Sequence, residues 1–450
     1  MKQRYKRLRY QKKKLRNLFL FKCIFGTTIE LTIKKKQKQK AMKHTYIFSF
    51  VLGFFLITGC DIANSGDGIN EIKLTEKTAR LLEAENDFGF ELFQNVYAAE
   101  TENKNIMVSP LSVSLALAMT YNGASGETKT AMEKTLKVYG LTPEEINTSY
   151  QTLLDGLKSL DKKVLLEIAN AIFYREGFPV EEEFVSTNKT YYNAEVDALN
   201  FSSPVALKTI NGWVANKTND KIEKILDAIS SDHVMFLINA IYFKGMWASE
   251  FDKDKTTENS FYPENGSSIQ TGFMNQTQTV AMASNDLFSA VQLPYGKGNY
   301  NMFVFLPEPD KTLQDIVDKL DKDNWETWMQ SFAETKDVII KLPKFKYEYE
   351  ITLNDVLSEM GMGVAFTDAA DFTGINKNGQ LKIDFVKHKT FIDVNEEGTE
   401  AAAVTVVGIE FTSAPQNVVF NANRPFLYAI TEKSTGAVLF MGTVKNPAYE

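Results

Sequence analysis

Cysteine and histidine are scarce in this sequence of 450 residues. Its two cysteines, Cys23 and Cys60, exclude a disulfide framework and a four-thiolate zinc site. Three histidines, His44, His233 and His388, leave little for a histidine-rich metal site. Catalytic motifs of fixed spacing are missing too, since there is no Walker-type phosphate loop, His-Glu-x-x-His or Cys-x-x-Cys. The sequence therefore predicts no metal, no other cofactor and no enzyme.

Hydrophobic residues make up 44 % of the chain and charged residues 24 %, a composition typical of a globular protein with a large core. The charge is unevenly distributed. Residues 1–41 hold 15 lysines and arginines against one acidic residue, which leaves 35 basic and 56 acidic side chains, a net charge of −21, for the other 409 residues. An acidic body repels nucleic acid, so we expect no nucleic-acid partner for it.

An apolar run from Tyr46 to Ile57 follows a short charged start at Met42 and precedes Thr58-Gly59-Cys60. This order is typical of a secretory signal, and the run is shorter than the ~20 residues of a membrane span. The end of the run resembles the lipobox of bacterial lipoproteins. That resemblance implies that residues 42–59 are a signal peptide and that Cys60 is lipidated. The alternative is an ordinary signal followed by an incidental thiol.

This interpretation divides the chain into four parts. Residues 1–41 are expected to be an upstream false start, with a genuine basic extension that binds RNA or an anionic membrane as the alternative. Residues 60–74 are small and polar and predict a flexible tether, and residues 75–450 are expected to form one domain. The expected location is the bacterial cell envelope, lipid-anchored in a membrane, on the periplasmic side or at the cell surface.

Hydrophobic periodicity predicts helices first and strands later. Apolar residues recur at three- and four-residue spacing over 75–98, 112–123, 126–136 and 143–160. Strand-like runs follow at 164–174, 234–243, 289–294, 300–306, 338–342, 381–394 and 418–421. Residues 426–430 and 437–444 alternate like a hairpin closed by Ser434-Thr435-Gly436. No linker separates two domains after residue 75, so the pattern predicts one large α+β domain.

Residues 393–417 behave like neither core nor ordinary loop. The odd positions from 399 to 409 are Thr399, Ala401, Ala403, Thr405, Val407 and Ile409, all small or apolar, whereas Glu400 and Glu410 occupy even positions. This alternation, without proline from 398 to 414, is typical of a half-buried strand, yet its alanine-rich first half is a weak strand former. A segment that can form a strand but has only a weak tendency to do so is suited to a conformational switch. The alternative is a low-complexity connecting loop.

The start of this segment resembles a known family. Asn395-Glu396-Glu397-Gly398-Thr399-Glu400-Ala401-Ala402-Ala403 resembles the hinge of the reactive-centre loop in serpins that inhibit proteases. Other segments resemble serpins in family order: Asn105–Ser112, Leu237–Trp247, Val291–Tyr295, Asp371–Ile375, Asn423–Leu427 and Gly436–Pro447. Asp220 departs from the family, which usually has glycine there. The resemblance covers about 75–448 and implies the serpin fold, with three β-sheets, eight to nine helices and an exposed reactive-centre loop.

The resemblance also implies roles for single residues. Ser109, Ser112, Asn239 and His388 would form a polar cluster beneath the opening of the central sheet, and Trp247 would lie where the loop begins to insert. It implies a monomer that works once. A target protease cleaves the loop, is held as a covalent acyl-enzyme and is carried across the sheet as the loop inserts. Serine proteases are the expected targets, with cysteine proteases as a second class.

The scissile bond is predicted by counting. In the family the attacked carbonyl lies fourteen residues after the hinge glycine, which gives Thr412–Ser413, and Phe411–Thr412 is the alternative. Phenylalanine would suit a chymotrypsin-like protease and threonine an elastase-like one. No lysine or arginine occurs between Lys389 and Arg424, so a trypsin-type acidic pocket has nothing to bind. The alternative function is a non-inhibitory serpin-like carrier or binding lipoprotein. Bulky, charged or proline residues in the hinge would favour that alternative.

Overall fold

A computed structural model describes residues 71–158, 160–264, 266–399 and 418–447, all of which belong to one compact unit, Asp67–Glu450. The α-helices of the described residues number nine: α2 (Glu76–Ala99), α3 (Pro110–Tyr121), α4 (Gly126–Thr135), α5 (Pro143–Leu157), α6 (Glu182–Tyr192), α7 (Pro204–Lys217), α8 (Leu313–Val317), α9 (Lys322–Ser331) and α10 (Asn354–Leu357). The short helical turns are η1 (Lys253–Lys255), η2 (Ser358–Met362) and η3 (Gly363–Phe366).

The same residues form fifteen strands, which are β1 (Ile106–Val108), β2 (Val164–Arg175), β3 (Glu195–Leu199), β4 (Met235–Met246), β5 (Thr257–Phe261), β6 (Ile269–Ser284), β7 (Phe288–Tyr295), β8 (Tyr300–Pro307), β9 (Ala333–Pro343), β10 (Phe345–Thr352), β11 (Lys387–Asn395), β12 (Gly398–Thr399), β13 (Val419–Asn421), β14 (Phe426–Glu432) and β15 (Val438–Val444). Among the paired strands of the described residues, only β2–β3 and β9–β13 are parallel, and a mostly antiparallel pairing is expected for the α+β class.

Strand pairing arranges these strands in two sheets. The central sheet has the order β10-β11-β12-β4-β2-β3. The larger sheet runs β1-β15-β14-β8-β7-β6-β9-β13, with β5 paired to β6. Two of the three expected sheets are thus continuous by hydrogen bonding, because the long strand β6 belongs to both. Its first residues pair with β5 and its last with β7, and its register against β9 shifts between Gln278 and Val280.

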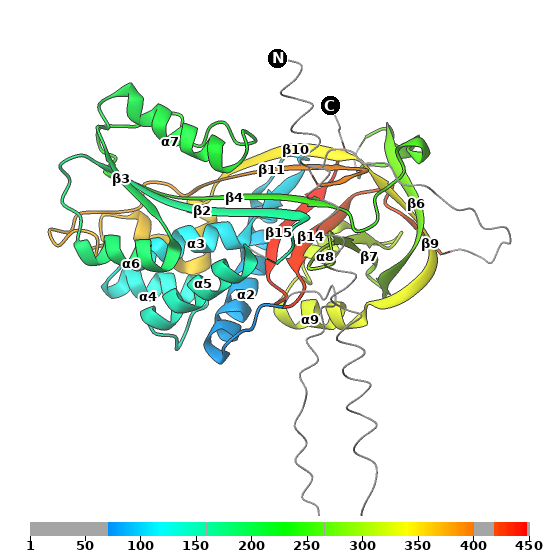
Figure 1. Cartoon of the computed structure of the whole chain (residues 1–450), viewed down its shortest axis with the longest axis horizontal. Helices are drawn as coiled ribbons and strands as arrows, with labels where there is room; N and C mark the ends of the chain where they lie inside the picture. The colour runs from blue at the N-terminus through cyan, green and yellow to red at the C-terminus, as the bar shows by residue number, and fades with distance from the viewer. Residues whose placement is uncertain (1–70, 159, 265, 400–417, 448–450) are drawn as a thin grey trace, which may run out of the picture. The chain divides into compact units, whose positions relative to one another are not determined.

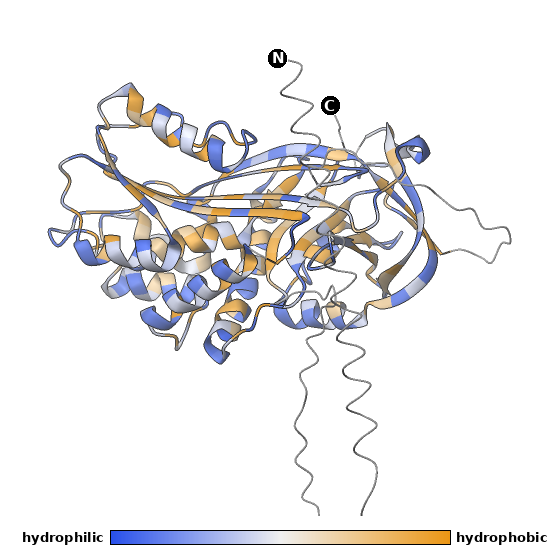
Figure 2. Cartoon of the chain, viewed as in Figure 1, coloured by the Kyte–Doolittle hydropathy of each residue, from blue (hydrophilic) through white to orange (hydrophobic). Residues whose placement is uncertain are grey.

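The helices cover the central sheet unequally. Helices α2 to α6 lie on one face of β2 and β4, and α7 lies on the other (Figure 1). The main core lies between the first helix group and the two sheets, and a smaller cluster around Ile210 and Phe236 lies under α7. Helix α3 is buried on nearly all sides, whereas Figure 2 shows hydrophobic stripes on the sides of α2 and α5 that face the strands. This is the amphipathic pattern that the sequence periodicity predicts.

Capping residues explain why the first helices begin where they do. Thr75 and Ser109 accept backbone hydrogen bonds at the starts of α2 and α3, and Pro110 takes the first helical position of α3. Thr142 and Glu145 form a capping box at the start of α5. The four predicted helices and the closing hairpin are confirmed, with ends that differ by a few residues from those expected.

One predicted strand is partly wrong. Residues 381–386 were expected to be strand, but β11 begins only at Lys387. The neighbouring strand β10 ends at Thr352, and Asn354, which starts α10, instead donates to the carbonyl of Asp384 and accepts from the N–H of Val386. Without a strand beside them, residues 381–386 have no ladder to join, although their apolar side chains resemble those of a strand.

The first described residues already contact the domain. The Ile72 N–H donates to Ser434 Oγ at 3.0 Å, and the Ile72 side chain packs against Gly156 of α5. Leu74 also packs on the core. The packed part of the chain therefore starts before residue 75, because the end of the predicted tether carries two apolar side chains.

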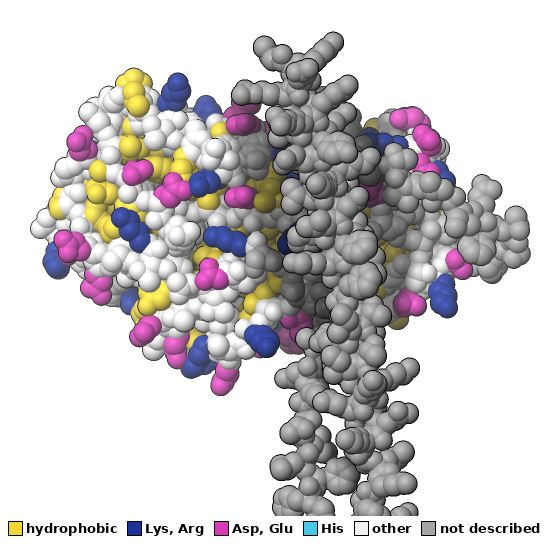
Figure 3. All heavy atoms as spheres, in the orientation of Figure 1, with side chains coloured by type: hydrophobic (Ala, Val, Ile, Leu, Met, Phe, Trp, Pro, Cys, Tyr) yellow, Lys and Arg dark blue, Asp and Glu magenta, His cyan; other side chains and the backbone are white. Residues whose placement is uncertain are grey.

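Acidic and basic side chains are interspersed on the face of the domain seen in Figure 3. Several of them form exposed ion pairs, such as Lys382–Asp368 at 2.6 Å. Among the helices that the structure describes, none has both the length and the apolar character needed to cross a bilayer.

Candidate functional site

The central sheet has a gap between two of its strands. β12 lies between β4 and β11 and consists of two residues. Gly398 pairs with Met246 and Asn395, and Thr399 pairs with Gly245 and Val394. Across the described residues no strand pairing joins β4 to β11 directly. Beyond Thr399 the two strands therefore flank a gap, which we call the slot.

Aromatic packing fixes β12 at the top of the slot. The hydroxyls of Thr399 and Tyr295 lie 2.7 Å apart, and the Tyr295 ring stacks on Trp247 with a centroid distance of 4.5 Å. The Trp247 indole N–H donates to the Asn395 carbonyl at 2.9 Å. Gly398 has a φ of +150°, and a Cβ there would lie 2.1 Å from the Gly245 carbonyl oxygen, so this position requires glycine.

Two buried carboxylates hold the residues before β12. Glu396 accepts from Thr256 Oγ1 at 2.7 Å and pairs with Lys344 at 3.3 Å. Burial alone would raise the pKa of Glu396, but the Thr256 hydrogen bond and the Lys344 charge bring it below its usual value. Glu397 pairs with Lys253. The hinge is therefore anchored up to Thr399.

The predicted polar cluster is divided by the slot. His388 of β11 is buried, and its Nε2 accepts from the Ser109 N–H at 3.0 Å. Ser109 Oγ donates to the Leu439 carbonyl at 2.7 Å and accepts from the Ser112 N–H at 3.3 Å. Burial lowers the pKa of His388 to about 4, so the imidazole is neutral and free to accept.

Asn239 lies on the other side of the slot, on β4. Its Nδ2 donates to Asn170 Oδ1 of β2 at 2.8 Å, and Asn170 in turn donates to the Tyr192 carbonyl. The structure thus brings Ser109 to His388 and Ser112 to Ser109. It places Asn239 across the slot and Trp247 at the hinge end.

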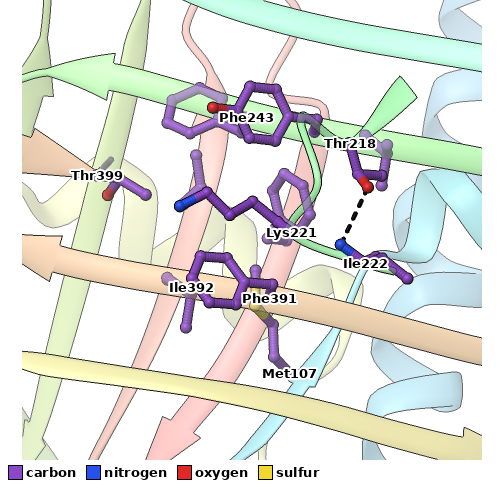
Figure 4. Close-up of a pocket in the computed structure, with 12 residues that line it drawn as sticks. Met107, Thr218, Lys221, Ile222, Phe243, Phe391, Ile392 and Thr399 are labelled. Atoms are coloured by element: carbon purple, nitrogen blue, oxygen red, sulfur yellow. Dashed lines mark hydrogen bonds between the residues drawn. The ribbon is translucent and has the colours of Figure 1, made fainter. Parts of the chain in front are cut away.

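The slot is narrow near β12 and wide at its far end. Just below Thr399, an opening of only about 10 Å³ is lined by Lys221, Phe243 and Phe391. Figure 4 shows the Lys221 side chain running between the two strands toward Thr399, and its Nζ lies 5.1 Å from the Phe391 ring centroid. Farther down, a cavity of about 420 Å³ is lined by α3 residues, by 234–241 and by 380–389.

Sequence reasoning missed both features. The cavity has no local signal, because it forms between a helix, a strand and an irregular segment that are distant in sequence. The position of Lys221 between β4 and β11 had one weak signal in the sequence. Its neighbour Asp220 stands where the family usually has glycine. Asn219 and Asp220 both have left-handed backbone, with φ of +50° and +60°, which glycine adopts more easily than aspartate.

Several predicted site residues lie outside the described residues: Cys60, Glu400, Ala401, Ala402, Ala403, Phe411, Thr412 and Ser413. Within the described residues, no group of histidine, cysteine, aspartate or glutamate side chains is arranged to hold a metal ion.

The central sheet thus holds two residues of a distant segment between β4 and β11, which are not paired with each other among the described residues. The family model described as Serpin (serine protease inhibitor) matches residues 83–447. An uncharacterized serpin-like protein of Methanosarcina mazei is 34 % identical over 376 residues, covering 82 % of this chain and 87 % of that protein.

Solved structures agree with this match. The thermophilic serpin tengpin in its native state aligns with a TM-score of 0.76 and 35 % identity, covering 84 % of this chain and 96 % of that one. Human thyroxine-binding globulin aligns with a TM-score of 0.75 and 29 % identity, covering 83 % and 100 %. The chain belongs to the serpin family and has the serpin fold. Family membership suggests protease inhibition rather than catalysis.

Proposed function

We propose that this serpin is a single-use inhibitor of elastase- or chymotrypsin-like serine endopeptidases, with cysteine proteases as a second class. It acts by cleavage of the segment after Thr399 and insertion of that segment into the slot, with the protease held as a covalent acyl-enzyme. The observation that carries the proposal is the position of β12, which is paired on both sides although β4 and β11 are not paired with each other among the described residues.

The register of β12 supports this mechanism. Continued along both neighbours, it would pair Thr405 with Asn239 on one side and His388 on the other. Odd-numbered residues from 401 to 409 would then face the main core as Thr399 does, and all of them are small or apolar. Residues 405–409 would run between 235–239 and 384–388, segments that line the cavity of about 420 Å³.

The free energy available is large enough. A new strand of about a dozen residues adds on the order of ten ladder hydrogen bonds at ~1 kcal/mol net each. Burial of Val407, Ile409 and the alanine and threonine methyl groups contributes several kcal/mol more. The total is comparable with the whole stability of an ordinary domain, ~5–15 kcal/mol. A change of this size can distort the active site of a bound protease.

Incubation with a protease panel tests the proposal. We expect an elastase- or chymotrypsin-like protease to give a complex that survives a denaturing gel, whereas trypsin gives none. Cleavage without any covalent complex would contradict inhibition. Mass spectrometry of the C-terminal fragment released from the complex identifies the bond. A fragment that begins at Ser413 supports Thr412–Ser413, one that begins at Thr412 supports Phe411–Thr412, and any other start refutes both.

A non-inhibitory carrier is the second candidate. The cavity of about 420 Å³ has the size of a small-molecule site, and one structural relative is a thyroxine-binding protein. The alanine-rich hinge argues against it, because non-inhibitors usually carry bulky, charged or proline residues there. The two functions differ in how cleavage changes thermal stability, because only insertion of the cleaved segment adds a strand to the sheet.

We also propose that Cys60 carries a lipid that anchors the protein in the cell envelope as a monomer. The support is the lipobox-like end of the apolar run at residues 57–60. Cells that express the full chain and are fed a labelled fatty acid should incorporate label into the wild type but not into Cys60→Ala. Equal labelling of both would exclude lipidation at Cys60.

A further inference from the structure

A carboxylate interrupts the apolar face of α2. Leu81, Leu82, Phe88 and Leu92 lie on that face with the spacing of a core-facing helix, and Glu85 occupies the same face at only 3 % exposure. Nothing in the slot or its hinge involves this side chain. A buried carboxylate without a cation is costly, so its surroundings indicate which protonation state the fold accepts.

Two hydroxyl groups from two other helices face Glu85. Ser114 of α3 donates to Oε1 at 2.6 Å, and Tyr150 of α5 donates to Oε2 at 2.8 Å. The Tyr150 ring packs on that of Tyr192 of α6, with centroids 5.8 Å apart. Glu85 therefore links α2, α3 and α5 through one carboxyl group.

The charged groups between α2 and its neighbours lie elsewhere. Lys77 pairs with Glu145 of α5, and Glu83 pairs with Lys322 of α9, both on partly or largely exposed surface. The titratable groups that face Glu85 itself are Tyr150 and Tyr192. No cation pairs with Glu85 in the part of the chain that the structure describes.

The hydrogen bonds can satisfy both forms of the carboxyl group. Ser114 Oγ also lies 3.0 Å from the Leu111 carbonyl. When Glu85 is protonated, its O–H can donate to Ser114 Oγ while the Ser114 hydroxyl turns to Leu111. When it is ionised, Ser114 and Tyr150 both donate to a buried negative charge. Burial outweighs these two hydrogen bonds and raises the pKa of Glu85 to about 7.

We infer that Glu85 is a proton-operated lock of the helix layer, which holds α2, α3 and α5 together when protonated and loosens them when ionised. Ser114 lies on α3, and Ser109, the N-cap residue of that helix, donates its N–H to His388 at the edge of the slot. If the proposed function holds, loss of the proton eases opening of the slot. The lock itself is a property of the fold and does not depend on inhibition.

The direction of the pH effect follows from the carboxyl chemistry. The folded protein binds the Glu85 proton more tightly than the unfolded chain, so this contribution to stability is complete below the ordinary glutamate range. It is lost as the pH rises through neutrality. His388 acts in the opposite direction at acidic pH, so wild type must be compared with a variant that keeps His388.

Urea unfolding of the full chain at pH 5.5 and 8.5 tests the lock. The unfolding constant of wild type divided by that of Glu85→Gln should rise by at least about tenfold from pH 5.5 to pH 8.5, because only wild type loses the contribution of the Glu85 proton. Glu83→Gln, which removes an exposed carboxylate two residues away, should leave wild-type pH dependence. Parallel pH profiles for wild type and Glu85→Gln would overturn the inference.

A second variant serves if Glu85→Gln does not fold. Tyr150→Phe removes a donor to the ionised carboxylate while it keeps the ring, so it should shift the pH midpoint of the stability loss upward. A merely structural role of Tyr150 would lower stability equally at every pH. That outcome, or a midpoint unchanged from wild type, would also overturn the inference. Neither measurement uses a protease, so failure of the lock and failure of inhibition are distinguishable.

Discussion

The two ends of the slot differ in how they are filled. At the hinge end, Thr399 is paired on both sides and hydrogen-bonded to Tyr295, which stacks on Trp247. At the far end there is a cavity of about 420 Å³, and Asn239 Oδ1, which lines it, has no hydrogen-bond partner among the described residues. Among the described residues, β12 fills the hinge end and no strand fills the far end. The strand insertion proposed above needs this asymmetry, in which one end of the slot is fixed and the other has room for a strand.

Filling the empty end should give the largest effect. A single nick between residues 405 and 413 frees the segment after Thr399 to enter the slot. We expect the melting temperature to rise by about 20 °C, because on the order of 10 kcal/mol of strand pairing and burial is gained. Differential scanning calorimetry of intact and nicked protein measures this rise. An unchanged or lower melting temperature would favour the carrier function.

Blocking the entrance should give the next largest effect. Thr399 is buried, and Thr399→Arg would place a charge between β4 and β11 at a cost of several kcal/mol. The variant should be cleaved as a substrate, with the fraction of protease trapped on a denaturing gel lowered at least about tenfold. Thr190→Arg on the exposed surface of α6 is the matched control. Trapping by Thr399→Arg at the wild-type level would rule out insertion.

Acid should weaken one edge of the slot. Burial lowers the pKa of His388 to about 4. The contribution of neutral His388 to the free energy of unfolding is therefore complete above pH 6.5 and is lost as the pH falls toward 4. The loss amounts to about 3 kcal/mol. His388→Gln keeps an acceptor for the Ser109 N–H and should lack this loss in urea unfolding, whereas His233→Gln should retain it. If His388→Gln shows the wild-type acid profile, protonation of His388 is not what weakens this edge.

The segment over the narrow opening should give the smallest effect. Asp220 adopts left-handed backbone before Lys221. Asp220→Gly should raise the free energy of unfolding by up to about 1 kcal/mol, because glycine carries no penalty there. Asp197→Gly in the exposed strand β3 should do the opposite. A destabilised Asp220→Gly would mean that contacts of the Asp220 side chain outweigh the backbone strain.

Elements with a strong local signal could be predicted from the sequence. The helix 143–157 has a capping box and a first-position proline, and the closing hairpin has a turn at Ser434-Thr435-Gly436, so local rules sufficed. β1 and β12 have three and two residues, too few for any periodicity. Residues 381–386 carry strand-like side chains and form no strand, because β10 ends at Thr352, opposite Lys387, and leaves them no strand to pair with.

The site shows the same division. The alternation from Thr399 onward could be read from the residues, although most of it lies outside the described residues. The roles of Gly398, Ser109, Ser112 and His388 came from family resemblance. The cavity and the partners of Glu85 could not be predicted, because Ser114 and Tyr150 reach that carboxylate from other helices. Periodicity places Glu85 within a helix but cannot say what faces it.

The pairing of β1 with β15 has a consequence for the order in which the chain is made. Ile106 pairs with Thr443, which is synthesised 337 residues later. At ~5–20 residues per second, a ribosome needs roughly 20 to 70 seconds to cover that interval. Throughout this time β1 lacks β15, the strand with which it pairs in the larger sheet. The larger sheet can therefore be completed only after nearly the whole chain has been made, whereas the described strands of the central sheet are all synthesised by residue 399.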